Sequence, residues 1–139
     1  MAPENDVPAT GYLDTTPFWN GVRERRLVLQ FCTDSGRFQH PPRPVSIFTG
    51  SRRLEWREAS GAGTIHASSV LHAIPGGGHD RRDHCYASVD LDAGVRLLGR
   101  LLDCAPGDAR VGARVVLAWD TLPDGRGYPA FRLESTTVR

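Results

Sequence analysis

The three cysteines have the most reactive side chains in this chain, and their wide spacing in the sequence argues against a common site. Cys32, Cys85 and Cys104 are far apart and odd in number, which does not suit a disulfide framework, so we expect free thiols. Cys85 follows His84 and Asp83, an order that resembles a nucleophile with its base. Neighbouring residues of a strand point to opposite faces, so these side chains diverge. We therefore expect no catalytic residue and no enzymatic activity in the isolated chain.

Histidines and glycines offer two further candidate sites. Five histidines are present, and the even spacing of His66 and His72 can place both on one face of a strand. No acid or cysteine completes a recognisable ligand set beside them, so we expect no metal there. Gly76, Gly77 and Gly78 lie in a run that lacks the Lys-Ser or Lys-Thr of a phosphate-binding loop. We interpret this run as a loop that contacts a partner.

The N-terminal part of the chain predicts a flexible leader, a short helix and a small irregular module. Residues 1–14 form the leader, because they contain few apolar side chains. A threonine followed by a proline is typical of a helix start and predicts a helix over about 16–25. Phe18 and Trp19 are adjacent on this helix and point about 100° apart, so one can pack inward while the other contacts a partner. The helix and the module after it span residues 15–53.

From residue 54 onward the sequence has the pattern of short strands separated by turns. The expected strands cover residues 54–59, 63–73, 84–91, 94–102, 114–120 and 129–134. Strands of this number and length fit a five-stranded Greek-key barrel of the OB type better than a sandwich, which needs about seven. We therefore predict a mainly β protein in which residues 54–139 form the barrel.

Composition limits the classes of function. A chain of 139 residues can hold one domain, or one small β domain with an appendage. The net charge of +1 argues against a nucleic-acid-binding protein, which normally carries a clear basic surplus. The sequence contains neither a signal peptide nor an apolar run of membrane-spanning length, so we expect a cytoplasmic protein without a membrane partner.

Short motifs from residue 15 onward form a recognisable set. They are TPFW at 16–19, LVLQFC at 27–32, PPRP at 41–44, LEW at 54–56, ASG at 59–61, VDLD at 89–92, GVRLL at 94–98 and GARVV at 112–116. Together they resemble the DUF35 family over nearly all of the chain. The resemblance implies an N-terminal helix, a rubredoxin-like zinc ribbon and a C-terminal OB fold.

The resemblance is incomplete at the metal site. Family members place four cysteines in two C-x-x-C pairs, whereas the matching positions here are Cys32, Ser35, Ser46 and Thr49. A serine or threonine hydroxyl stays protonated near neutral pH and cannot replace a thiolate on zinc. We therefore predict a ribbon that keeps its shape without zinc, with Cys32 as a buried thiol.

The loss of zinc must be compensated by other interactions. Structural zinc supplies about 10–16 kcal/mol in small zinc-finger domains. Four apolar side chains near the two turns, those of Phe38, Val45, Ile47 and Phe48, are candidates for a replacement core. Their burial can return roughly 6–12 kcal/mol before entropy costs. We therefore expect an apolar mini-core inside the ribbon.

The resemblance also implies a function. Family members are usually bound to thiolase-like enzymes, thiolase-fold aldolases of steroid side-chain degradation or MaoC-type enoyl-CoA hydratases, and the partner carries the catalytic residues. The expected role is thus an accessory subunit that binds no cofactor itself, with a CoA thioester as a potential ligand of the complex. Two alternatives stay open: a single-stranded nucleic-acid-binding OB fold, and a stand-alone acyl-CoA-binding protein whose arginines hold the CoA phosphates.

Overall fold

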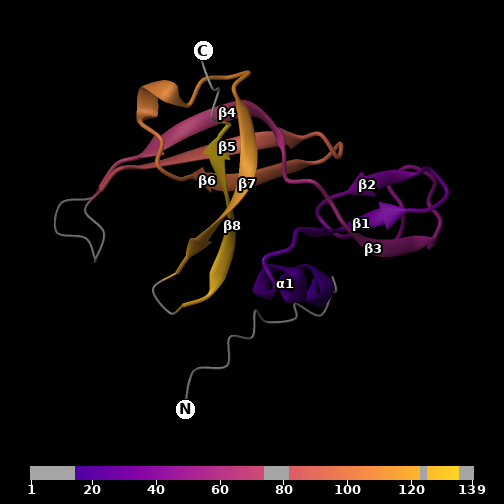
Figure 1. Cartoon of the computed structure of the whole chain (residues 1–139). Coiled ribbons are helices and arrows are strands. Elements are labelled where there is room, and N and C mark those ends of the chain that lie inside the picture. Colours follow the sequence, from indigo (N-terminus) through magenta and orange to yellow (C-terminus); the bar gives the residue numbers. More distant parts are fainter. Residues whose placement is uncertain (1–14, 74–81, 123–124, 135–139) are drawn as a thin grey trace.

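The protein consists of a small three-stranded sheet, a short helix and a closed β-barrel. A computed structural model describes residues 15–73, 82–122 and 125–134, and Figure 1 shows the three parts. The elements are α1 (Thr16–Arg23), β1 (Val28–Cys32), β2 (Arg37–Gln39), β3 (Leu54–Glu58), β4 (Gly63–Leu71), β5 (His84–Leu91), β6 (Arg96–Leu101), a 3₁₀ turn (Pro106–Asp108), β7 (Arg114–Thr121) and β8 (Gly127–Leu133). None of the helices in these ranges is long and apolar enough to cross a membrane.

The barrel closes in the strand order β4-β5-β6-β8-β7. Its strands are antiparallel except for the β6 and β8 pair, and β7 closes the barrel by pairing with the start of β4. Alternate residues point inward and pack with almost no exposure, and they include Ile65, Val89, Val115 and Phe131. The prediction of a mainly β protein with a short N-terminal helix and a five-stranded OB barrel is therefore confirmed.

The first expected barrel strand belongs to the other sheet. Strand β3 pairs antiparallel with β1, which lies between β2 and β3 in the three-stranded sheet. The boundary that we expected between residues 53 and 54 thus falls inside this sheet, and the barrel begins with Gly63. The sequence pattern of β3 did not show this, because an alternating strand looks the same whichever sheet it joins.

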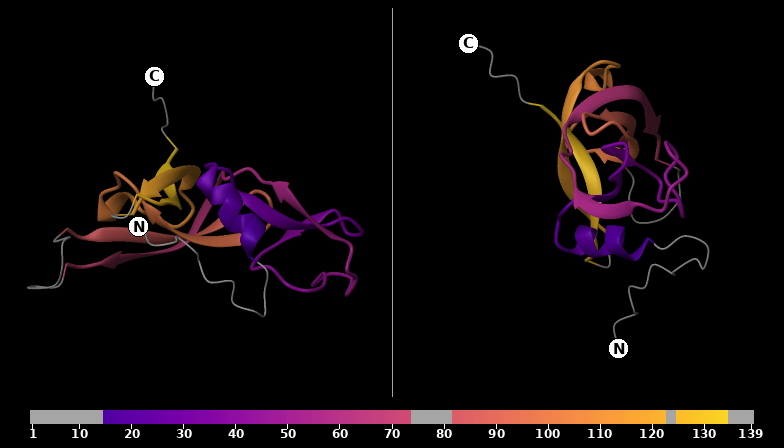
Figure 2. Two further views of the ribbon diagram at one scale, coloured as in Figure 1. Left: turned by 90° about the horizontal axis from the view of Figure 1, so that it is seen from below. Right: turned by 90° about the vertical axis from the view of Figure 1, so that its right-hand side faces the viewer.

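Helix α1 connects the two sheets through a shared apolar core. Its buried Phe18 and Val22 belong to one cluster with Leu27 and Leu29 near or on β1 and with Phe131 of the barrel. Figure 1 and the views in Figure 2 show α1 beside both β8 and the three-stranded sheet. The helix is shorter than the expected 16–25, since it ends at Arg23.

The turn after α1 explains this early end. Arg25 adopts a left-handed conformation with φ of 56°, which a continuing helix does not allow. The amide of Arg26 then donates to the Gly21 carbonyl at 2.8 Å, and the amide of Arg25 donates to that of Val22 at 3.0 Å. These two bonds form a Schellman motif, which satisfies the last carbonyls of the helix and turns the chain toward β1.

The interior of the ribbon is polar, which contradicts the expected apolar mini-core. Ile47 is 61% exposed and Val45 is 37% exposed, and Phe38 and Phe48 are only partly buried. The guanidinium of Arg37 stacks on the Phe48 ring, 4.0 Å from its centroid, at the edge of the module. Burial of these four side chains therefore does not replace the zinc.

Two buried glutamines occupy the ribbon interior instead. Gln30 of β1 and Gln39 of β2 are cross-strand partners with exposed fractions of 8% and 1%. The Gln39 amide nitrogen donates to the Gln30 side-chain oxygen at 2.8 Å and to the Val45 carbonyl at 3.2 Å. The Gln39 side-chain oxygen accepts from the Ile47 amide at 2.8 Å. One side chain thus fixes three groups of the sheet and of the loop that follows β2.

Gln30 completes this arrangement by holding the same loop from β1. Its side-chain oxygen accepts from the Arg43 amide at 2.8 Å, and its nitrogen donates to the Arg43 carbonyl at 3.0 Å. A buried amide with all its partners stabilises one chain geometry, because any other leaves a polar group unsatisfied. We call Gln30 and Gln39 the glutamine pair.

We predict that the glutamine pair is required for stability. Gln39→Ala should lower the free energy of unfolding by about 1–3 kcal/mol, because it leaves buried amide and carbonyl groups without partners. Gln39→Glu keeps the shape but replaces the donating amide by a carboxylate beside two acceptor oxygens, so it should cost at least as much. Urea unfolding measures both losses.

Arg52→Ala is a suitable control, because Arg52 is exposed in the same module and its loss should change stability by less than about 0.5 kcal/mol. A Gln39→Glu variant as stable as the wild type would contradict the hydrogen-bonding role.

Candidate functional site

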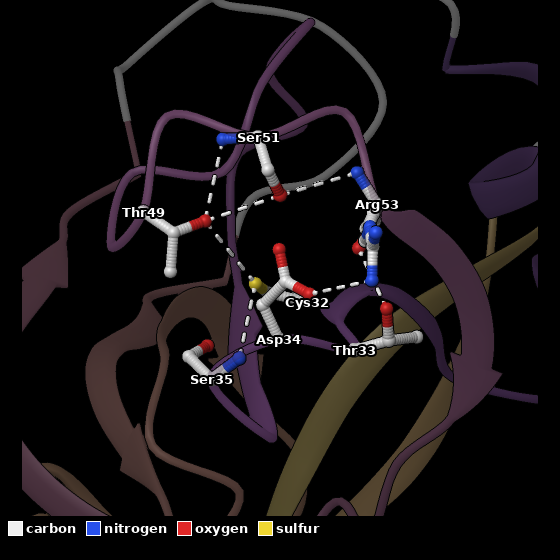
Figure 3. A network of polar contacts seen from close by, with 7 residues as sticks. All are labelled: Cys32, Thr33, Asp34, Ser35, Thr49, Ser51 and Arg53. Carbon is white, nitrogen blue, oxygen red and sulfur yellow. Dashed lines mark hydrogen bonds and ion pairs between the residues drawn. The ribbon is translucent and has the colours of Figure 1, made fainter.

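Two short loops, here called knuckles, bring the four degenerate ligand positions together. The Sγ atom of Cys32 accepts a hydrogen bond from the Ser35 amide at 3.4 Å and lies 3.9 Å from the Thr49 hydroxyl. The Ser46 hydroxyl accepts from the amides of Phe48 and Thr49 at 3.1 Å and 3.2 Å. Figure 3 shows Cys32, Ser35 and Thr49 around one centre. The spacing read from the sequence thus corresponds to a real cluster.

The two knuckles have the same backbone geometry. Gly36 follows Cys32 by four residues, and Gly50 follows Ser46 by the same number. Both glycines are left-handed, with φ of 68° and 74°, a conformation that side chains disfavour. In each knuckle the glycine amide donates to the carbonyl of the first ligand position, at 2.8 Å and 2.9 Å. The turn geometry is therefore kept although three thiols are absent.

A second layer of hydrogen bonds ties the first knuckle to the chain that follows the second (Figure 3). The Thr49 hydroxyl donates to the Ser51 hydroxyl at 3.1 Å, which accepts from the Arg53 amide at 3.3 Å. The Thr33 hydroxyl donates to the Arg53 carbonyl at 3.2 Å, and the Arg53 guanidinium pairs with Asp34 at 3.5 Å. Hydroxyl groups thus link the two knuckles.

The environment of Cys32 favours the thiolate form. The side chain of Ser35, followed by that of Ser46, lowers the pKa of Cys32 to about 7 against the opposing effect of burial. Hydrogen-bond donors directed at sulfur stabilise its negative charge. The thiol is fully buried, so this charge is not presented to a substrate.

The donor set does not fit zinc. Structural zinc sites use four thiolate or imidazole ligands, and here one thiol faces three hydroxyl-bearing residues. Within the part of the chain that the structure describes, no three His, Cys, Asp or Glu side chains gather in a metal-binding group. The absence of zinc remains a prediction, which elemental analysis can test.

The helix presents one aromatic side chain at the surface and one in the core. Phe18 is 8% exposed and packs edge-on against Trp19 with ring centroids 5.0 Å apart, and it also lies 5.6 Å from the His40 ring. Trp19 is half-buried, and its ring lies 6.5 Å from that of Tyr128 on β8. The inward and outward positions expected for this pair thus correspond to Phe18 and Trp19, respectively.

A small apolar surface surrounds Trp19. Leu98 on β6 is 66% exposed and Tyr128 is 40% exposed, and both line a cleft of about 40 Å³ with Trp19. We call Trp19, Leu98 and Tyr128 the apolar surface. Sequence reasoning missed Leu98 and Tyr128, since only the strand order of the barrel brings β6 and β8 side by side. The predicted contact residues Gly76, Gly77 and Gly78 lie outside the described residues.

The residues first considered for catalysis and for metal binding make separate polar contacts in the structure. Cys85 is buried in the barrel, while Asp83 lies 3.1 Å from His72 rather than beside the thiol. The Ala73 amide, and then His72, hold the pKa of Asp83 below its usual range. His66 lies 3.6 Å from Asp90, a residue that also pairs with an arginine. The Cys85 thiol donates instead to the Cys104 carbonyl oxygen at 3.6 Å. That Asp83, His84 and Cys85 form no catalytic set stays a prediction.

We predict that the purified protein contains no stoichiometric zinc and stays folded in excess chelator. The triple variant Ser35→Cys, Ser46→Cys and Thr49→Cys should regain metal binding, because both knuckles keep their geometry. Elemental analysis and the absorption of a cobalt-loaded sample measure this. About one zinc per wild-type chain would contradict the prediction.

The pKa of Cys32 predicts a pH-dependent stability. A thiol with a lowered pKa in the folded state stabilises the fold above its unfolded pKa, and this contribution is lost as the pH falls through the folded value. With a folded pKa of about 7 against 9.0, the stability difference between wild type and Cys32→Ser should grow from about pH 7 to about pH 9.

Cys104 provides the opposite control, because burial raises the pKa of its thiol. A thiol with a raised pKa in the folded state stabilises the fold below its unfolded pKa, and this contribution is lost as the pH rises above that value. The difference in free energy of unfolding between wild type and Cys104→Ser should therefore shrink above about pH 9. Urea unfolding from about pH 7 to above pH 9 measures both trends. Parallel curves for wild type and Cys32→Ser would contradict the thiolate environment.

Comparisons with known proteins agree with this architecture. The family described as "ChsH2, C-terminal OB-fold domain" matches residues 56–120. A probable enoyl-CoA hydratase alpha subunit of Thermomonospora curvata is 34% identical over 118 residues, which cover 83% of this chain and 36% of the relative. The 3-oxo-4,17-pregnadiene-20-carboxyl-CoA hydratase alpha subunit of Mycobacterium tuberculosis is 34% identical over 117 residues, with the same coverage. This chain thus spans about a third of the length of these curated relatives.

A solved structure matches over almost the full length of both chains. It is a chain of the Ltp2-ChsH2(DUF35) aldolase, with a TM-score of 0.75 and 31% identity over 86% of this chain and 94% of the other. Agreement in fold, length and sequence over this range is a sign of common descent. We therefore conclude that this chain belongs to the DUF35 family.

Proposed function

We propose that this chain is a non-catalytic accessory subunit that docks onto a thiolase-superfamily or MaoC-type enzyme acting on acyl-CoA. The observation that carries the proposal is the match to a chain of the Ltp2-ChsH2(DUF35) aldolase over nearly its whole length. The names of the hydratase alpha subunits support the same class of substrate. The proposal includes a cytoplasmic location, which the odd number of cysteines supports.

The apolar surface supports a docking role. Trp19, Leu98 and Tyr128 come from three different elements and are all at least partly exposed. Aromatic and leucine side chains gathered in this way are costly to leave in water and frequently form the centre of protein interfaces. Because α1 and the barrel share one core, the three side chains are presented on a rigid support.

The charged groups of the barrel support a scaffold rather than a catalyst. Arg96 pairs with Asp90 at 2.7 Å, and Arg114 pairs with Asp92 at 2.6 Å. Each of these arginines, with its hydrogen bond and charge, holds the pKa of its carboxylate below the usual range. Carboxylates held ionised by a fixed arginine are poor proton donors near neutral pH. These groups therefore stabilise the barrel surface.

We predict that the apolar surface binds the partner enzyme. Trp19→Ala should weaken the complex by about 2 kcal/mol or more, roughly thirtyfold in affinity, while it lowers the melting temperature of the isolated subunit less than Phe18→Ala does. Phe18→Ala should lower the melting temperature more, because this ring is buried in the core. Co-expression and pull-down with a thiolase-like or MaoC-like protein encoded beside this chain, followed by calorimetry, measures both effects.

Two exposed leucines on the barrel provide a matched control. Leu98 on β6 belongs to the apolar surface, whereas Leu71 on β4 is also exposed but lies elsewhere on the barrel. Leu98→Ala should weaken the complex, and Leu71→Ala should not. Equal effects of the two leucine variants would show that the docking surface lies on another face.

Two further outcomes would contradict the proposed function itself. The isolated chain should show no thiolase, hydratase or thioesterase turnover of CoA esters, so activity lost in Cys85→Ala would show that it is an enzyme. Binding of single-stranded DNA or RNA should be weak, with micromolar or poorer affinity at physiological salt. A tight complex whose affinity falls steeply with salt would favour the nucleic-acid-binding alternative.

A further inference from the structure

Two of the three cysteines line one polar pocket at the end of the barrel. The pocket has a volume of about 180 Å³ and lies between the start of β5 and the turn after β6. Cys85 and Cys104 form part of its wall, together with Arg100 and Asp103. No part of the proposed docking function uses this pocket.

The strand register brings the two cysteines together. Cys85 pairs with Leu101, the last residue of β6, in the antiparallel β5 and β6 ladder. Asp103 then turns the chain in a left-handed conformation with φ of 50° and places Cys104 back over the start of β5. The Cys85 thiol donates to the Cys104 carbonyl oxygen at 3.6 Å. The sulfur of one cysteine is therefore in contact with the other cysteine.

The two thiols differ in access to solvent. Cys85 is 4% exposed, whereas Cys104 is partly exposed and donates to the adjacent Ala105 carbonyl at 3.3 Å. Burial, then the charge of Cys85, then that of Asp108 raise the pKa of Cys104. Cys104 is therefore the thiol that a small molecule can reach first.

We propose that Cys85 and Cys104 are a redox-active thiol pair that a low-molecular-weight disulfide, such as oxidised glutathione, converts to an intramolecular disulfide. In the first step Cys104 loses its proton to solvent and attacks one sulfur of the small disulfide, whose S–S bond breaks. One small thiol leaves after protonation, and Cys104 carries the other half. In the second step Cys85 loses its proton to solvent, and its thiolate attacks the Cys104 sulfur and breaks the mixed disulfide. The displaced half takes up a proton and leaves as a second small thiol. Two protein thiols are oxidised and one small disulfide is reduced to two thiols.

The third cysteine provides an internal control. Cys32 lies in the ribbon and is fully buried among its hydrogen-bond donors, so it has no partner thiol within the module. Arginine-specific cleavage places the three cysteines in separate peptides, because Cys32 lies in 27–37, Cys85 in 83–96 and Cys104 in 101–110. A cross-link between any two is therefore identified without ambiguity.

The experiment incubates the folded full chain with oxidised glutathione and analyses the trypsin digest by mass spectrometry. We expect a linked pair of the peptides 83–96 and 101–110, with Cys32 remaining free. Cys32→Ser should give the same link. Cys85→Ala should instead accumulate a glutathione adduct on Cys104, and Cys104→Ala should give neither product.

Thermal unfolding tests whether the link forms in the native fold. We expect the oxidised protein to melt about 5–10 °C higher, because the disulfide restricts the unfolded chain without distorting the barrel. Three free thiols after incubation, a link that includes Cys32, or a lower melting temperature would each overturn the proposal. The wild-type peptide map alone decides the question if a cysteine variant does not fold. The peptide map does not depend on partner binding. A negative result therefore contradicts the thiol pair alone and says nothing about the proposed docking function.

Discussion

The structure depends on how the two knuckles are held without four thiolates. A zinc ion supplies about 10–16 kcal/mol to a small module of this kind, whereas each hydrogen bond of the glutamine pair contributes about 1 kcal/mol. Hydrogen bonds can therefore set the geometry of the knuckles, but they do not replace the metal as a source of stability. The remaining support comes from the barrel. Phe18, Val22, Leu27 and Leu29 are part of the same apolar cluster as the barrel interior, so the ribbon folds as an extension of a larger core.

Helix α1, the ribbon and the barrel share one apolar core, and this explains why the apolar surface combines side chains from the helix and from the barrel. Because residues of the helix and the ribbon belong to the same apolar cluster as the barrel interior, the ribbon keeps a fixed position against the barrel. Helix α1 is the element between them, and it places Trp19 against Tyr128 with ring centroids 6.5 Å apart. The proposed docking surface is therefore composite, since it needs both the helix and the β6 and β8 pair of the barrel. Its rigidity reduces the entropy lost when a partner binds.

The sequence was informative where local chemistry decides structure and less so where strands from distant segments meet. Turn residues and alternating strands predicted five barrel strands. The resemblance to the DUF35 family implied the knuckle cluster, because it matched Cys32, Ser35, Ser46 and Thr49 to the ligand positions. The sheet to which β3 belongs could not be predicted, because an alternating pattern of apolar and polar residues is the same whichever strand β3 pairs with. The glutamine pair was missed for a related reason. A polar residue within an apolar strand signals a special role, but its partners lie in loops whose path is set by the tertiary fold.

The knuckles retain the surroundings of a metal site after losing most of its ligands, and this accounts for the unusual state of Cys32. In metal sites, groups behind the ligands orient them and stabilise their negative charge. The Ser35 amide donates to the Cys32 sulfur in this manner at 3.4 Å, and the side chains of Ser35 and Ser46 lower the pKa of Cys32. These groups would support a thiolate on a metal ion, and they equally support a thiolate without one. The lowered pKa of Cys32 therefore follows from the groups that the knuckle geometry places around its sulfur.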